Sequence, residues 1–68
     1  MKEKWCEVLV FRNVDNGSIK RVLVCADDSM RYLALDGVVL AHEKKGWVLV
    51  DENIIGWVEE VGVAELEQ

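Results

Sequence analysis

Residues 4–26 constrain the fold most strongly, and they read KWCEVLVFRNVDNGSIKRVLVCA. Two runs rich in Val, Leu, Ile and Phe flank the dipeptide Asn16-Gly17. Asn and Gly both tolerate positive φ, which a two-residue type I′ hairpin turn requires at its two central positions. The stretch therefore predicts a β-hairpin with strands over 4–14 and 19–26. A turn centred on Asn16-Gly17 would pair residues whose numbers sum to 33.

The two faces of this hairpin have an unusual composition, because both are mostly apolar. An antiparallel pair with one solvated face normally alternates apolar and polar residues. We therefore expect a second copy of the chain, or a partner protein, to cover the outer face. The alternative is that the hairpin folds back across its own barrel. The residues predicted to mediate self-association are Trp5, Leu9, Phe11, Val22 and Val24.

The rest of the chain continues the pattern of short apolar runs and turns. Turns are expected at 35–37, 43–46 and 51–53, between strands over 31–35, 38–42, 47–50 and 54–60. No stretch before residue 61 has a clear helical period. The prediction is a single all-β domain over 1–68. It consists of an N-terminal hairpin (4–26), the remaining barrel strands (31–63) and an acidic tail (64–68), and residues 63–68 are expected to fray, the alternative being one helical turn.

The composition limits the partners that the chain can have. The net charge is −5, and residues 51–68 carry six acidic side chains and no Lys or Arg. Nucleic acids and anionic membranes are bound through cations, so neither is expected as a partner. A protein with a basic surface is favoured instead. The alternative is that the acidic end only keeps the chain soluble.

Other sequence features suggest a cytoplasmic protein. No apolar run approaches the roughly 18 residues that span a bilayer. The first residues, MKEKW, lack the apolar stretch of a signal peptide. The two cysteines form no dense framework, which suits a reducing compartment. A domain of 68 residues is also marginally stable by itself, so support from a second subunit is expected.

Three segments resemble SH3 domains when they are taken in order. Residues 32–40, YLALDGVVL, look like the strand and diverging turn of that family. Gly46-Trp47 and Gly56-Trp57-Val58 resemble its two later Gly-Trp segments, and the second is also similar to bacterial SH3-type domains. The match covers residues 22–63 approximately. It implies an SH3-like small barrel with an additional N-terminal hairpin.

The resemblance also implies a binding groove, although an incomplete one. Trp47 would line the groove, and Asp27 and Asp28 would stand in for the acidic specificity loop. The family's groove tyrosines would fall at Val24 and Ala26, which are not aromatic. Proline-rich peptides need an aromatic-lined groove. The resemblance therefore favours the fold more than the usual ligand.

The cysteines and the histidine are the candidates for chemistry. In the predicted register Cys6 and Cys25 are diagonal neighbours, so a disulfide is borderline and two buried thiols are favoured. His42 is the only histidine, and no Cys-x-x-Cys pair exists, so neither a metal site nor a cofactor is expected. A nucleophilic pair of Cys25 and His42 lacks a third group to orient the imidazole. We expect His42 to lie on the surface.

The acidic and basic pairs are better explained as solvated charges. Neighbours in a strand point to opposite faces, so Glu59 and Glu60 cannot share a site. The pairs Asp27-Asp28 and Asp51-Glu52 are expected in turns, and Lys44-Lys45 is expected at a hairpin tip. No Gly-rich phosphate loop is present. The chain is therefore not expected to be an enzyme.

The function expected from the sequence is a protein-interaction module or accessory regulator that self-associates. Interface hot spots are enriched in Trp and Tyr. The predicted partner-binding residues are Trp47, Trp57, Tyr32, Asp27 and Asp28. The alternative is a purely structural subunit of a homo-oligomeric assembly, of the kind that phages use.

Overall fold

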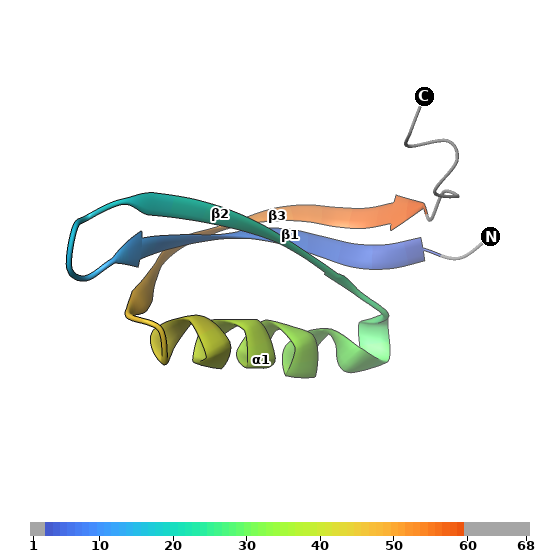
Figure 1. Ribbon diagram of the computed structural model, residues 1–68. Helices are drawn as coiled ribbons and strands as arrows, with labels where there is room; N and C mark the ends of the chain where they lie inside the picture. Colours follow the sequence, from blue (N-terminus) through green and yellow to red (C-terminus); the bar gives the residue numbers. More distant parts are fainter. Residues whose placement is uncertain (1–2, 60–68) are drawn as a thin grey trace, which may run out of the picture.

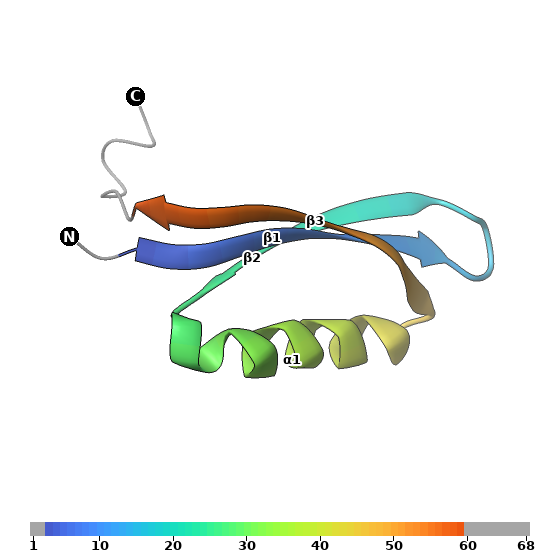
Figure 2. The ribbon, with the colours of Figure 1, turned by 180° about the vertical axis from the view of Figure 1, so that it is seen from behind.

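The computed structural model describes residues 3–59, which form a three-stranded antiparallel sheet and one helix (Figure 1). The elements in chain order are β1 (Glu3–Asn13), β2 (Ile19–Ala26), the 3₁₀ turn η1 (Asp28–Met30), α1 (Arg31–Glu43) and β3 (Trp47–Glu59). The strand order is β2-β1-β3. A predominantly β, antiparallel chain is thus confirmed. The sheet is not closed into a barrel, and α1 lies along one of its faces (Figure 2).

The N-terminal hairpin is confirmed, but its predicted register is wrong by two residues. Cys6 lies opposite Cys25, and Arg12 lies opposite Ile19. The reason is a longer loop over 14–17, closed by a hydrogen bond from the amide of Asn13 to the carbonyl of Ser18 (2.8 Å). Loops of this length are common hairpin connections.

Asn13 holds this loop in place through its side chain. The Asn13 Oδ1 atom accepts hydrogen bonds from the amides of Asp15 (2.9 Å) and Asn16 (3.2 Å). Gly17 ends the loop with a φ of 75°, a conformation that glycine adopts at little cost. The Asn-Gly pair thus marks the turn correctly, whereas the side chain of Asn13 decides its length.

The prediction of two strands and a turn over 31–42 is wrong, because this segment is the helix α1. Its half-buried residues follow a helical spacing on the side that faces the sheet: Ala34, Leu35, Val38, Val39 and His42. Gly37 lies inside the helix and has no positive φ. The segment that resembled the SH3 diverging turn is therefore helical, and an SH3 domain is not confirmed.

The core lies between α1 and the sheet. Leu9, Phe11 and Val24 are buried there, and Phe11 is 0% exposed. The half-buried residues around them are Val22, Ala34, Leu35, Val38, Val39, Trp47 and Leu49. The apolar hairpin face that carries Trp5, Leu9 and Phe11 is thus covered by α1 from the same chain. The prediction that a second copy or a folded-back hairpin provides this cover does not hold for this face.

β3 is one continuous strand, whereas a turn was predicted at 51–53. Its pairing with β1 shifts at two places, between Cys6 and Glu7 and between Val10 and Phe11. The shifts leave Val50 and Ile55 without an opposite residue on β1. Such bulges increase local twist. The turn predicted at 43–46 is confirmed.

The predicted tail over 64–68, and the end of the predicted barrel strands, lie outside the described residues. Within residues 3–59, no helix has the length and apolar character needed to cross a bilayer.

Candidate functional site: a groove between the helix and the sheet

A partly open groove with a volume of about 720 Å³ lies between α1 and the sheet. Its walls come from α1, β1 and β3, and none of its lining residues belongs to β2. The apolar lining residues are Trp5, Leu9, Tyr32, Leu35, Val39, Leu40, Leu49 and Ile54, and the polar ones are Glu7, Arg31, Asp36 and Glu52. This volume lies within the range of about 300–1,000 Å³ that ligand pockets usually have.

Aromatic rings gather at one end of the groove. Trp5 lies opposite Trp57 in the sheet, and their ring centroids are 5.4 Å apart in an edge-to-face arrangement with an interplanar angle of 75°. The Arg31 guanidinium carbon lies 4.7 Å from the centroid of the Trp5 ring and 5.0 Å from that of Tyr32. Each distance falls within the range of a cation–π contact. The start of α1 and the end of β3 are thereby joined to β1.

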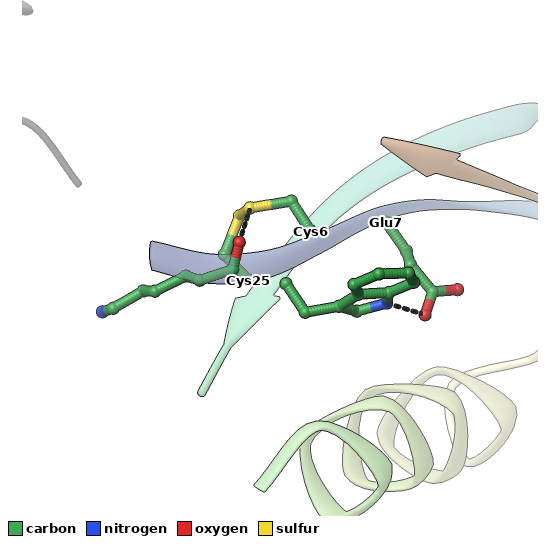
Figure 3. The surroundings of a disulfide bond; sticks show 5 residues. Cys6, Glu7 and Cys25 are labelled. Carbon is green, nitrogen blue, oxygen red and sulfur yellow. Dashed lines mark hydrogen bonds between the residues drawn. A yellow bond between two sulfur atoms is a disulfide. The ribbon is translucent and has the colours of Figure 1, made fainter. Parts of the chain in front are cut away.

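Glu7 places a carboxylate in the groove. Its side chain is only 7% exposed, and its Oε2 atom accepts a hydrogen bond of 2.6 Å from the Trp5 indole nitrogen, Nε1. Figure 3 shows the Glu7 side chain on the side of β1 that faces the helix. With Asp36 and Glu52, the groove carries three carboxylates against one guanidinium, that of Arg31. Its polar groups are therefore predominantly acidic.

The two tryptophans predicted to form one binding surface lie at opposite ends of β3. Trp47 is opposite Asn13 at one end and packs against the core, while Trp57 is opposite Trp5 at the other end. The ammonium nitrogen of Lys20 lies 5.5 Å from the centroid of the Trp47 ring. Trp47 therefore packs at the edge of the core between α1 and the sheet.

Trp57 and Tyr32, by contrast, lie in the same region. Tyr32 lines the groove and is 69% exposed, whereas Trp57 is 48% exposed and packs on Trp5 without lining the groove itself. Asp27 is exposed just before η1, and Asp28 is the first residue of η1. The sequence reasoning missed Glu7, Arg31 and Leu35 as groove residues. The helical spacing of the apolar residues over 34–42 is the signal that could have identified the α1 side of the groove.

Cys6 and Cys25 form a disulfide across β1 and β2 (Figure 3). The prediction of two thiols is wrong because the hairpin register places them directly opposite, with their Cα atoms 4.1 Å apart. The disulfide lies on the face of the sheet that points away from α1. The cytoplasmic location was expected partly because the two cysteines form no dense framework, and it stays a prediction.

His42 is a half-buried residue of α1, not a surface residue at the end of a strand. It packs on Phe11 on one side of the sheet, while the Cys25 sulfur is bonded to Cys6 on the other. The sheet therefore separates the two members of the nucleophilic pair that the sequence allowed. In the described part of the chain, no group of three His, Cys, Asp or Glu side chains could hold a metal ion.

Comparison with protein-family models, with curated proteins and with solved structures finds no match to this chain.

Proposed function

We propose that the chain is a non-catalytic protein-binding module that takes an extended, basic peptide segment into the groove between α1 and β3. The observation that carries this proposal is the lining of the groove, which combines apolar walls with three carboxylates. Such a combination suits a segment that alternates apolar and cationic side chains. A module of this kind can act as an accessory regulator by occupying one segment of its partner.

The position of β3 supports an extended ligand. Among the strands of residues 3–59, β3 is an edge strand, so the backbone groups on its outer side have no strand partner there. The groove lies on this side of the molecule, because β3 contributes Leu49, Glu52 and Ile54 to it. A peptide that adds to a sheet edge gains main-chain hydrogen bonds, and every second side chain points to the same face. A peptide paired with β3 would therefore direct every second side chain toward the face of the sheet that carries the groove.

The charge of the groove supports a basic ligand. Glu7 is buried beside the aromatic end, while Asp36 and Glu52 are exposed on α1 and β3. A cationic side chain that enters between them would exchange water for carboxylate partners. The net charge of −5 would also accelerate encounter with a basic partner at low ionic strength.

The test uses two labelled peptides of equal length, one alternating Leu with Lys and one alternating Leu with Glu. We expect the Lys peptide to bind and to shift the backbone amide NMR signals of residues 49–54. The substitution Glu52→Lys should weaken its binding by about tenfold or more, since like charges then face each other. The matched control is Glu43→Lys, an exposed acid outside the groove, which should leave binding nearly unchanged.

Two results would contradict the proposal. The first is equal binding of the Lys and Glu peptides, which would show that the carboxylates of the groove contribute nothing. The second is a set of shifted amides confined to β2, which contributes no residue to the groove.

A further inference from the structure

The second face of the sheet, opposite α1, has no covering layer among the described elements (Figure 1). We call it the open face. The even-numbered residues of β1 point to it, together with the residues paired with them on β2 and β3. Val8 and Val10 lie at its centre, and the exposed apolar residues beside them are Ile19, Leu23 and Val48. An apolar stripe of this kind marks an interaction surface.

Opposite charges flank the centre of this stripe. Val10 is paired with Arg21 on β2 and with Asp51 on β3, so the three residues form one row across the sheet. Arg21 and Asp51 therefore stand at the same height on the two edges, one cationic and one anionic. A face with a cation on one edge strand and an anion on the other is complementary to a second copy of itself that is turned by half a turn.

We propose that the open face is the interface of a homodimer in which two copies pack sheet against sheet. The two-fold axis runs parallel to β1 between the two sheets. Rotation by half a turn about this axis brings β2 of one protomer over β3 of the other. Arg21 of each protomer then faces Asp51 of the other, and the interface contains this pair twice, as an isologous contact requires.

The neighbouring rows fit the same axis. One row away, Ile19 and Val48 are both paired with Arg12, so Ile19 of one protomer would pack on Val48 of the other, and the two exposed Arg12 side chains would meet at the axis and have to turn toward solvent. On the opposite side, Cys25 and Gly56 are both paired with Cys6. Cys25 of one protomer then lies over Gly56 of the other, which has no side chain, and the two Cys6 residues face each other at the axis. An axis parallel to the strands also gives the aligned packing that is usual for stacked sheets.

The proposal is independent of the peptide groove, because the two surfaces lie on opposite sides of the sheet. It also assigns the expected self-association to a different set of residues. The residues first assigned to it, such as Leu9 and Phe11, are already buried beneath α1. The exposed apolar residues of the open face, Ile19, Leu23 and Val48, are the ones left for a second copy.

The decisive experiment combines charge reversal with mixing, measured by analytical ultracentrifugation of the full chain. Arg21→Glu alone, or Asp51→Arg alone, places like charges opposite each other on both sides of the axis. Each should raise the dissociation constant of the dimer by about tenfold or more. An equimolar mixture of the two variant proteins should form a heterodimer with an affinity close to that of the original dimer, since both pairs are restored between chains.

Matched controls separate the interface from general effects of charge and exposure. Lys45→Glu and Glu43→Lys reverse charges away from the open face and should leave the dimer unchanged. Leu23→Lys should dissociate it, whereas Leu33→Lys on α1 should not, although the two leucines are similarly exposed (62% and 66%). Circular dichroism confirms that each variant is folded.

Three outcomes would overturn the proposal. One is a monomer at a concentration of 100 µM or so, well above the range in which specific dimers usually form. Another is a dimer that tolerates both charge reversals. The third is a mixture of the Arg21→Glu and Asp51→Arg proteins that remains monomeric while each is folded, since the reciprocal pairing then does not exist.

Discussion

The imidazole ring of His42 is stacked on the ring of Phe11, with centroids 4.3 Å apart and an interplanar angle of 10°. Phe11 is the most deeply buried side chain of β1, and His42 belongs to the last turn of α1. The His42 Nδ1 atom also lies 2.8 Å from the carbonyl oxygen of Val38, within hydrogen-bond distance. The stack therefore fixes the end of the helix to the central strand of the sheet.

Removal of this stack should destabilise the protein measurably. We expect His42→Ala to lower the free energy of unfolding by about 1 kcal/mol or somewhat more, since aromatic pairs contribute about 0.5–1.5 kcal/mol beyond burial. His42→Phe keeps a ring on Phe11 and should recover most of the loss. Urea unfolding followed by circular dichroism gives both values. Equal losses in the two variants would mean that the contact with the Val38 carbonyl, and not the stack, is what matters.

Gly37 provides a direct test of the helix. It lies inside α1 without a positive φ, and a Cβ atom added there would meet nothing within 4 Å. Alanine is favoured over glycine in a helix by about 1 kcal/mol, so Gly37→Ala should raise the free energy of unfolding by roughly that amount.

The control for this prediction is Gly46→Ala. Gly46 has a φ of 88°, which side chains with a Cβ rarely adopt, so this variant should be destabilised. A loss of stability in Gly37→Ala would contradict the helix. A loss of stability in Gly37→Ala is the result expected if Gly37 lay in a turn over 35–37.

The helix was missed because two local signals favoured a strand and a turn. Asp36-Gly37 is a common turn pair, and Val38-Val39 is β-branched. The helical spacing of the buried residues was present, but exposed apolar residues such as Leu33 and Leu40 obscured it. Tertiary packing decided the outcome, because α1 covers an apolar sheet face that the hairpin pattern alone had left exposed.

The hairpin was predictable, whereas its register was not. Apolar runs on both sides of Asn16-Gly17 indicate two paired strands whatever the loop length. The register depends on the side chain of Asn13, which adds hydrogen bonds to two loop amides. A shift of two residues preserves which residues share a face, so the two faces of the hairpin were assigned correctly. The same shift decided whether Cys6 and Cys25 meet.

The disulfide should contribute substantially to stability. It joins residues 19 positions apart, and closing a loop of this length restricts the unfolded chain by about 3 kcal/mol. Reduction should lower the urea midpoint accordingly. The double variant Cys6→Ser/Cys25→Ser should resemble the reduced protein and should not respond to reductant. Two titratable thiols in the air-oxidised, folded protein would contradict the disulfide.

The same disulfide closes a covalent ring that contains the hairpin from Cys6 to Cys25, including its loop over 14–17. A protease that cuts the exposed loop would therefore not release a fragment, because both halves of the hairpin would stay linked through sulfur. Such a nicked molecule keeps its mass apart from one added water, and separates into two pieces only after reduction. The loop is accordingly a place where the chain can be opened, extended or given new ends while the sheet stays joined.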